Sequence, residues 1–352
     1  MSIEANNPRT AAPRRGREAP RWLCFAAALA LYAVSSGLAH AEHITIGTSR
    51  LLAYVAVPIM IEKGFLTAEG LDAELATFDS AQPITTAVVS GDVDFGVGGL
   101  SAAFYNLAGQ GQLRVLAGGG REMPGFYNFA ILVSNRAATG GLASLKDLPT
   151  HMVGVTQLGS TLQYALGRVV EKYGLDLSTI RVTALQSNSN LFSALTGGQL
   201  DAAVMPGAPA APLIARGDIK RIAWVGDEVP GIQNNTAFTS TRTANERPEL
   251  VERFLRAYRK AARFYHDAVA DRNEQRRDGA NFFEVVAILA KFASLSLDDA
   301  KASLPWVDGD GRPDIGDIRH QIAWFKSQGM IKGAVDADAF IDKRYVVQLP
   351  AH

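Results

Sequence analysis

Two periodicities of apolar and polar positions alternate along most of this chain. Short apolar runs typical of buried strands are each followed by a stretch with the helical period, and glycine ends several of those stretches. This alternation predicts an α/β fold with mostly parallel sheets flanked by helices. The strands are expected at residues 43–49, 71–78, 93–97, 113–119, 128–135, 152–157, 180–185, 200–205 and 220–226.

One helix-and-strand phrase occurs twice. The segment AVVSGDVDF aligns without gaps with the segment ALTGGQLDA, so that Gly91 matches Gly198 and Asp94 matches Asp201. In each copy the glycine is expected to end a helix in the left-handed conformation. Each aspartate is expected to be a structural residue that accepts a hydrogen bond from a neighbouring backbone amide. A unit that is used twice predicts two lobes with one copy in each.

The pattern becomes helical after Pro248. Residues 249–268 place apolar side chains at i, i+3 and i+4 spacings, and basic residues take much of the opposite face. This is an amphipathic helix with the proline near its first turn. Further helices are expected around residues 282–292, 297–304 and 317–329, and we expect them to form a helical cap packed on one lobe.

The first 41 residues have the three parts of a secretory signal peptide. Five arginines lie within residues 1–21, an uncharged apolar run follows at residues 22–38, and the sequence Ala-His-Ala ends the segment. The apolar run is shorter than the roughly 18 to 20 residues that span a bilayer comfortably. We therefore expect a signal peptide at residues 1–41, cleaved after Ala41, and a periplasmic mature protein that begins at Glu42. An uncleaved membrane anchor is the alternative.

Composition excludes several functional classes. The chain of 352 residues carries 35 basic and 35 acidic side chains, which gives no electrostatic footprint for nucleic acid. Its single cysteine, Cys24, lies in the leader, so a mature chain has no thiol for a disulfide, a metal or a nucleophile. The histidines lack metal-site spacing, and VDGDGRPD at residues 307–314 carries Arg312 where a calcium loop needs oxygen, so it is interpreted as a turn. We expect no metal, no cofactor and no catalytic residue.

Four loops that follow predicted strands are candidate ligand contacts, because ligands of open α/β sheets bind at the carboxyl ends of the strands. They lie at residues 48–50, 98–101, 159–161 and 205–209. The glycines of the second loop would let a ligand approach the backbone. The third loop opens a helix, whose free amides and dipole favour a negative ligand. An ordinary serine or threonine helix cap is the alternative interpretation there.

Five segments carry a family resemblance: EKGFLTAEGLDAEL, AVVSGDVDFGVGG, TQLGSTLQYAL, ALTGGQLDAAVM and ERPELVERFLRAYRKAARFY. Together they resemble the nitrate/sulfonate/taurine family of ABC-importer substrate-binding proteins, whose fold is shared with pyrimidine-binding thiamine-precursor proteins. The resemblance implies a type 2 periplasmic-binding-protein fold, in which two lobes are joined by two crossing strands and hold the ligand between them.

The resemblance also implies domain boundaries. Lobe 1 would combine residues 42–130 with residues 240–352, which include the C-terminal helices, and lobe 2 would span residues 131–239. The crossing strands would lie at residues 128–135 and 236–241. Ligand contacts from both lobes exist together only in a closed state, so ligand binding is expected to shift the population toward closure.

The family's ligand contacts, transferred to matching positions, fall on the four loops and on nearby polar side chains. One departure concerns the last loop, where many relatives carry an acidic residue in the sequence W-E-P and this chain does not. The contact of that acidic side chain is therefore lost. The expected ligand-binding residues are Thr48, Ser49, Arg50, Gly98, Gly99, Leu100, Ser101, Gln157, Gly159, Ser160, Thr161, Met205, Pro206, Gly207 and Asn235.

The resemblance implies the periplasmic substrate-binding component of an ABC importer, a monomer that is not an enzyme. It would deliver a small organic anion, such as a sulfonate, taurine, nitrate or a carboxylate, to a membrane permease with its ATPase subunit. Binding or processing of a pyrimidine thiamine precursor on the same fold is the alternative. An aromatic ligand would suit Phe104, Tyr105, Phe126 or Tyr127 if any of them reaches the cleft. A sensory ligand-binding module of a receptor is a third interpretation.

Overall fold

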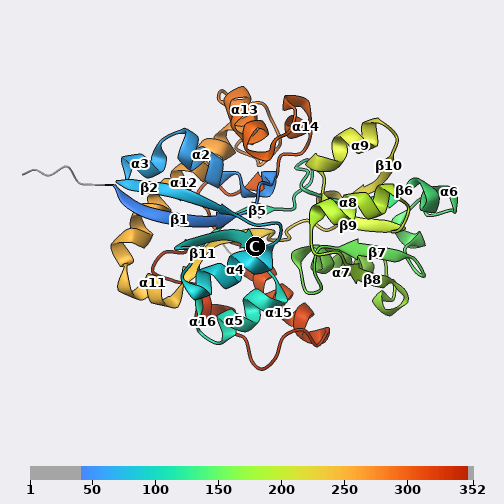
Figure 1. The fold of residues 1–352 in the computed structure, drawn as a ribbon, viewed down its shortest axis with the longest axis horizontal. Coiled ribbons are helices and arrows are strands. Elements are labelled where there is room, and N and C mark those ends of the chain that lie inside the picture. Colours follow the sequence, from blue (N-terminus) through green and yellow to red (C-terminus); the bar gives the residue numbers. More distant parts are fainter. Residues whose placement is uncertain (1–40, 348–352) are drawn as a thin grey trace, which may run out of the picture. The chain divides into compact units, whose positions relative to one another are not determined.

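Two five-stranded sheets form the framework of the protein in this computed structural model, which describes residues 41–347. The expected signal peptide lies outside the described residues, apart from Ala41. The first sheet has the order β2 (Leu71–Thr77), β1 (Glu42–Thr48), β3 (Phe95–Gly99), β11 (Asn235–Ser240) and β4 (Leu113–Gly118). The second sheet has the order β8 (Arg181–Ala184), β7 (Met152–Val155), β9 (Ala202–Pro206), β6 (Phe129–Ser134) and β10 (Ile219–Trp224). Figure 1 shows the two sheets.

In each sheet one strand runs against the other four. β11 pairs antiparallel with β3 and β4, and β6 pairs antiparallel with β9 and β10, whereas β1 and β7 pair in parallel with their neighbours. The two sheets therefore repeat one topology, and the predicted α/β class with mostly parallel strands is confirmed. The two reversed strands occupy the segments expected to cross between the lobes. A small third sheet pairs β5 (Gly120–Arg121) with β12 (Trp306–Val307).

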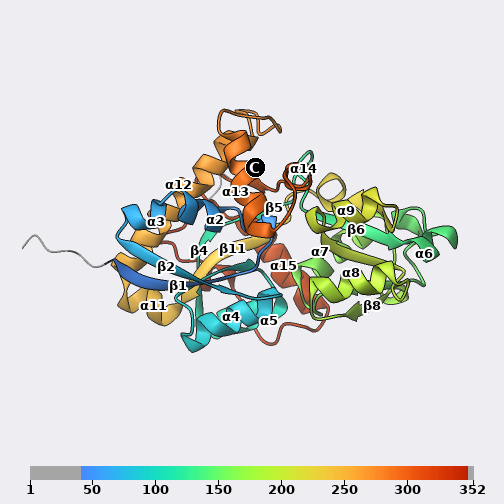
Figure 2. The same cartoon turned by 45° about the horizontal axis from the view of Figure 1, so that its top comes forward.

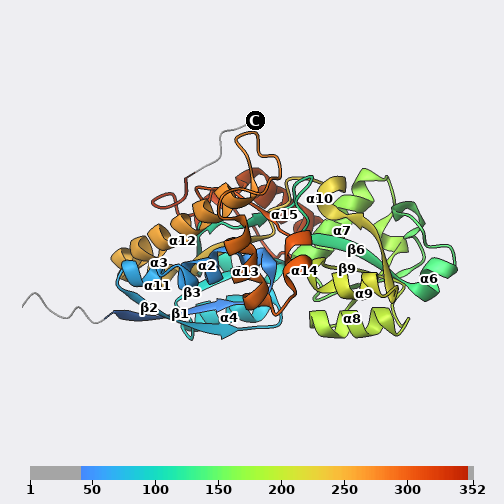
Figure 3. The same ribbon diagram turned by 90° about the horizontal axis from the view of Figure 1, so that it is seen from above.

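Helices cover both faces of the first sheet (Figure 3). On one face Ile44 and Ile46 pack with helices α2 (Ala56–Glu62), α3 (Phe65–Ala68) and α12 (Pro248–Val269). On the other face lie α4 (Ala81–Ser90) and α5 (Ala102–Gly109), whose Ile84 and Phe104 pack with Phe238. The expected amphipathic helix is α12, since its apolar stripe is buried.

The second sheet is covered in the same way. α7 (Thr161–Lys172) packs on the face that carries Val153 and Val155, while α8 (Asn188–Thr196) and α9 (Ala211–Ala215) pack on the face of Leu132. The glycines of the repeated phrase behave alike, because Gly91 has a φ of 88° after α4 and Gly198 has a φ of 69° after α8. The predicted left-handed helix stops are confirmed at both positions.

The C-terminal helices contact both halves of the fold. They are α13 (Phe282–Ala293), α14 (Leu297–Ala302), α15 (Ile315–Ser327) and α16 (Ala337–Phe340). α13 packs on α2 (Figure 2), whereas α14 contacts α9 and the short helix η4 (Ala208–Ala210). α15 packs against both α5 and α7, so the expectation that these helices form a cap on one lobe is wrong, because helical periodicity does not tell which elements a helix will contact. None of the helices within residues 41–347 has the length and apolar character needed to cross a membrane.

Short elements complete the described chain. The segment expected to end a strand at residue 226 turns into a helix after β10. These elements are η1 (Leu52–Tyr54), α6 (Asn135–Thr139), η2 (Leu145–Asp147), η3 (Leu177–Thr179), α10 (Val225–Glu228) and α11 (Thr241–Glu246).

Candidate functional site

A small cavity lies where strand ends from both sheets meet. Gly99 and Pro206 end β3 and β9, and Ser49 and Thr156 follow β1 and β7. The cavity has a volume of about 60 Å³, which leaves room for roughly two water molecules at about 30 Å³ each. Its lining residues are Ser49, Leu51, Ala53, Tyr54, Asp79, Ser80, Ala81, Gly99, Phe129, Thr156, Ser160, Thr161, Leu162, Asn188, Pro206, Asn234 and Asn235.

The structure brings part of the predicted site together. Of the expected residues, the cavity is lined by Ser49, Gly99, Ser160, Thr161, Pro206 and Asn235. The others lie outside it, and two of them line neighbouring cavities. Arg50 lines an adjoining cavity of about 270 Å³ together with Phe78 and Phe192, and Gln157 lines an open groove beside Gln82. The expected residues that line none of these three are Thr48, Gly98, Leu100, Ser101, Gly159, Met205 and Gly207.

Two of the expected loops contact each other directly. The hydroxyl of Thr161 donates to the carbonyl of Leu100 at 2.5 Å, and the backbone N–H of Ala102 donates to the carbonyl of Gly159 at 2.8 Å. These bonds join the start of α5 to the start of α7. The loops at residues 98–101 and 159–161 therefore close one side of the cavity, although several of their residues do not face it.

Three helices begin at the cavity wall. Ser80 and Ala81 open α4, Ser160 and Thr161 open α7, and Asn188 opens α8. The first N–H groups of a helix have no partner within the helix, and the helix dipole places partial positive charge there. Three such ends around one cavity form a site suited to an anionic group.

At the start of α7, Ser160 fits both interpretations, as a helix cap and as a residue of the ligand site. The Ser160 hydroxyl accepts a hydrogen bond from the Gln163 N–H at 3.4 Å, so Ser160 caps the helix while it lines the cavity. Among the described residues that line the cavity, Asp79 is the one charged side chain, and it is exposed. The donors that these residues offer to an anion are therefore backbone N–H groups and neutral side chains, and not lysine or arginine.

Tyr54 adds a neutral hydroxyl to the wall. Its side chain is buried, and its hydroxyl lies beside the Ser49 hydroxyl and the Gly99 backbone. Burial raises the pKa of Tyr54 to about 12, so the phenol stays protonated at neutral pH. Sequence reasoning missed Tyr54 because it lies in η1, beyond the polar loop that follows β1.

Asn188 and Asn234 also line the cavity and were not predicted from the sequence. Asn188 sits in a run of serine and asparagine directly after β8, which is the same strand-end signal that identified the other loops. Asn234 precedes β11 and gives no signal of its own beside the predicted Asn235. The side-chain oxygens of Asn188, Asn234 and Asn235 are buried and accept no hydrogen bond from the described residues.

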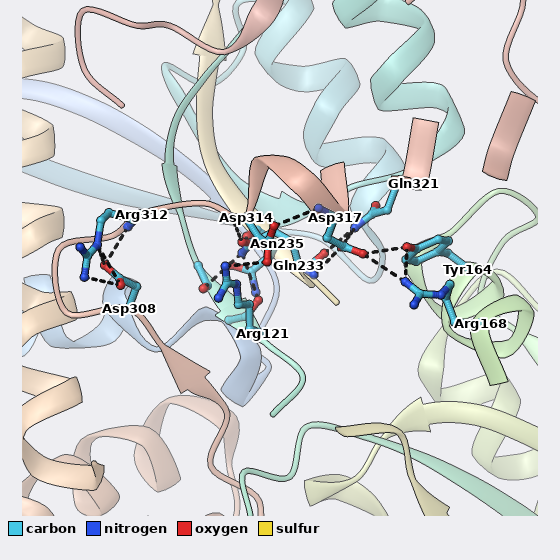
Figure 4. Close-up of polar contacts among 12 residues, drawn as sticks. Arg121, Tyr164, Arg168, Gln233, Asn235, Asp308, Arg312, Asp314, Asp317 and Gln321 are labelled. Atoms are coloured by element: carbon cyan, nitrogen blue, oxygen red, sulfur yellow. Dashed lines mark hydrogen bonds and ion pairs between the residues drawn. The ribbon is translucent and has the colours of Figure 1, made fainter. Parts of the chain in front are cut away.

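A buried polar network lies behind Asn235 (Figure 4). Asp317, near the start of α15, accepts hydrogen bonds from the Tyr164 hydroxyl of α7 at 2.7 Å and from the Gln233 backbone N–H at 2.7 Å. The side chain of Gln233 in turn donates to the carbonyl of Asn235 at 2.8 Å. Burial raises the pKa of Asp317. The network ties α15 to α7 and to the segment that enters β11.

The remaining candidates do not form a site. The 307–314 segment is a turn, as predicted, in which the Asp308 carboxylate accepts the N–H groups of Asp310 and Arg312 at 2.9 and 3.0 Å. Within residues 41–347 no cluster of three or more metal-ligating side chains is present. Of the aromatic residues considered for ring stacking, none lines the cavity: Phe104, Tyr105 and Phe126 are core residues, and Tyr127 stacks on Trp224 with ring centroids 4.7 Å apart.

Solved structures with the same fold include several ligand-binding proteins. The alkanesulfonate-binding protein SsuA from Xanthomonas axonopodis pv. citri, bound to MOPS, aligns with a TM-score of 0.69 and 18% identity over 85% of this chain and 98% of its own. The periplasmic nitrate-binding protein NrtA from Synechocystis PCC 6803 aligns with a TM-score of 0.66 and 13% identity over 86% and 85%. A DszB variant in complex with biphenyl-2-sulfinic acid aligns with a TM-score of 0.56 and 17% identity over 87% and 97%.

Family membership follows from the sequence itself. No functionally curated protein matches the chain. The model of the NMT1/THI5-like family matches residues 53–269, which is more than half of the chain and covers both copies of the repeated phrase. The resemblance seen in the sequence is therefore confirmed, and this protein belongs to the NMT1/THI5-like family, with the fold of the periplasmic binding proteins.

Proposed function

We propose that this protein is the substrate-binding component of an ABC importer and binds a small organic anion in the cavity between its two sheets. The observation that carries the proposal is the convergence of the starts of α4, α7 and α8 on one cavity. Peptide N–H groups and helix dipoles bind an anionic group without a full positive charge. The structures with the same fold support this class of ligand, since one is an alkanesulfonate-binding protein and another a nitrate-binding protein.

The size of the cavity supports a division of the ligand into two parts. A volume of about 60 Å³ suits a sulfonate, carboxylate or nitrate group. The adjoining cavity of about 270 Å³ shares Ser49, Leu51, Asp79 and Asn188 with it, so an organic tail would extend there. Arg50 lines that second cavity and lies over the Phe292 ring at 5.9 Å. We therefore assign the anionic group to the inner cavity and the tail to the outer one.

The proposed mechanism is capture by closure of two lobes. Lobe 1 combines residues 42–130 and 240–352, lobe 2 spans residues 131–239, and the ligand holds them together because both contribute to the cavity wall. A monomer in the periplasm, without its signal peptide, would present this closed form to a permease with an ATPase subunit.

Catalysis has less support than binding. The DszB variant shares the fold and holds a sulfinic acid, and a pyrimidine-processing enzyme is the other alternative. Among the described cavity-lining residues, however, none is a cysteine, histidine or lysine, and Tyr54 keeps its proton at neutral pH. The wall therefore offers hydrogen bonds and apolar contacts but no activated nucleophile.

A thermal-shift screen of the full-length protein tests the proposal. The panel would hold nitrate, taurine, alkyl and aryl sulfonates, short and aromatic carboxylates, and pyrimidines. A ligand at a hundred times its dissociation constant should stabilise the fold by about 2.7 kcal/mol. Stabilisation by an anionic class supports the proposal. Stabilisation by pyrimidines alone, or turnover of any compound detected by mass spectrometry, would overturn it.

A further inference from the structure

Glu122 is a buried carboxyl group that accepts hydrogen bonds from two residues of the cavity wall. It is 0% exposed and lies in the connection between β5 and β6. Its Oε1 accepts a hydrogen bond from the Asn234 side-chain amide at 2.8 Å and another from the Phe129 backbone N–H at 3.2 Å. Asn234 belongs to the connection between β10 and β11, Phe129 is the first residue of β6, and Glu122 itself does not line the cavity.

The two connections are held together at this point by backbone hydrogen bonds as well. The Glu122 N–H donates to the Ile232 carbonyl at 2.9 Å, and the Gly231 N–H donates to the Glu122 carbonyl at 2.7 Å. The carboxyl group is therefore fixed in position by its own backbone. It can impose an orientation on the side chain of Asn234, whose amide group donates to it.

The orientation of the Asn234 amide follows from these partners. Because the Phe129 N–H also points at Oε1, that oxygen acts as an acceptor, and the Asn234 group that faces it must be the NH₂. The amide oxygen is then the polar atom of the Asn234 side chain that is buried without a partner, and Asn234 is one of the residues that line the cavity. An unpaired buried oxygen is unfavourable until a donor reaches it.

Asn235 repeats the arrangement. Its NH₂ group donates to the Ala53 carbonyl at 2.9 Å, and its amide oxygen is also buried without a partner. The Asn235 oxygen lies over Gly119, where a Cβ atom on that glycine would be 1.8 Å away, so Asn234 is the residue that offers the cavity an acceptor. The starts of α4, α7 and α8 offer backbone N–H donors in the same cavity wall.

We propose that Glu122 is a specificity-determining residue, which holds the Asn234 amide so that the cavity selects a ligand with an N–H or O–H group beside its anionic group. The substrate class is then an amino- or hydroxyl-substituted sulfonate or carboxylate. The inference rests on the proposed function, since it assumes that this cavity is the ligand site. Glu122 acts through Asn234 and is a positioning residue, not a direct ligand contact.

Matched ligand pairs test the inference by calorimetry. Taurine is compared with propane-1-sulfonate, and 3-aminopropanoate with butanoate, because the two members of each pair share the acid group and the chain length. We expect the wild-type protein to prefer the member with the donor at least about tenfold, since a site built for a donor rejects an analogue that lacks it. Equal affinities, or tighter binding of the member without the donor, would overturn the inference.

Variants at Glu122 separate positioning from a purely structural role. Glu122→Met removes the acceptor and should reduce the preference to within about threefold. Glu122→Gln keeps an amide oxygen in place of Oε1 and should restore most of the preference. Asp201→Asn is the control, because it makes the same acid-to-amide change at a carboxylate away from the cavity and should leave the preference intact. A Glu122→Met protein that folds and keeps the wild-type preference would contradict the inference.

A ligand-free measurement distinguishes failure of this inference from failure of the proposed function. In nitrogen-15 NMR spectra of the wild-type protein, the Asn234 side-chain NH₂ should be slow to exchange with solvent. It should become exchangeable in Glu122→Met and remain slow in Glu122→Gln. If no pair member binds but this pattern holds, the proposed function fails while the orientation of Asn234 stands. If the Asn234 signals are the same in all three proteins, the inference fails whatever the ligand.

Discussion

Asp94 and Asp201 make the same hydrogen bond in the two sheets. The Asp94 carboxylate accepts the backbone N–H of Thr45 in β1 at 2.9 Å, and the Asp201 carboxylate accepts the backbone N–H of Met152 in β7 at 2.8 Å. Each aspartate stands just before a strand, β3 or β9, and ties it to the adjacent parallel strand, β1 or β7. The repeated phrase in the sequence therefore encodes one structural unit in each half, and the structural role predicted for both aspartates is confirmed.

Loss of Asp201 should weaken the second sheet without touching the cavity. Its carboxylate also pairs with Arg136 at 2.7 Å, and the aspartate is 8% exposed. Asp201→Ala leaves the Met152 N–H without its acceptor, so we expect about 1 to 3 kcal/mol of destabilisation in urea unfolding. Ligand affinity, measured on the folded protein, should be unchanged. A loss of affinity greater than the loss of stability would contradict this assignment.

The start of α7 should contribute to ligand binding as well as to stability. Ser160→Ala removes a helix cap and a cavity hydroxyl, so we expect about 1 kcal/mol of lost stability and roughly fivefold weaker binding. Ser134→Ala is the matched control, because Ser134 caps α6 by accepting the Ala137 N–H at 3.2 Å, away from the cavity. It should lose similar stability and no affinity. If Ser160→Ala and Ser134→Ala bind the ligand with equal affinity, Ser160 is not part of the ligand site.

Two adjacent glycines should differ in their effect on binding. A Cβ atom on Gly99 would lie 3.2 Å from the Thr161 hydroxyl and 3.3 Å from the Ala81 methyl, both in the cavity wall. Gly99→Ala should therefore narrow the cavity and weaken binding about tenfold or more. Gly98→Ala meets Ile84 at 3.3 Å in the core instead, so it should cost stability but leave affinity unchanged in calorimetry. A larger loss of affinity in Gly98→Ala than in Gly99→Ala would mean that the ligand binds elsewhere.

Glu122 should make the protein less stable as the pH rises toward 8. Burial raises the pKa of Glu122 from 4.5 to about 8, although hydrogen bonds from Asn234 and Phe129 oppose the shift. The folded state therefore binds a proton more tightly than the unfolded state. Its stabilising contribution is fully present below pH 4.5 and is lost as the pH rises through about 8. The slope is at most about 1.4 kcal/mol per pH unit.

Urea unfolding between pH 5 and pH 8 measures this contribution. The wild-type protein should lose stability across the range relative to Glu122→Gln, whose side chain does not titrate. Parallel curves for the two proteins would show that Glu122 is already ionised at pH 5. A wild-type curve that rises relative to the variant would mean that the pKa is lowered in the fold.

The sequence predicted the elements of this fold because their periodicities are strong. The alternation of strand and helix located both sheets, and the apolar stripe of α12 located a helix that is buried on one side. It did not predict that α15 would contact both α5 and α7. Such a contact depends on how elements far apart in the chain pack together, and no local pattern records that.

The cavity was predicted in part for a similar reason. A loop at the end of a strand can be recognised in the sequence, but the direction of each side chain in it cannot. Thr48 and Ser49 are both buried, yet Ser49 lines the cavity and Thr48 does not, while Arg50 turns to the Phe292 ring. Tyr54 reaches the cavity because η1 folds back over the end of β3. That arrangement depends on tertiary packing.

The place of β11 in the first sheet has a consequence for the order in which the molecule assembles. The second sheet comes from one continuous stretch, from β6 to β10, whereas β11 enters the first sheet between β3 and β4 only after that stretch is complete. Until the chain has been made as far as residue 240, β3 and β4 each keep an open edge. The first sheet is therefore begun first during synthesis but completed last. The edges of β3 and β4 stay unpaired until the strands of the second sheet have been made.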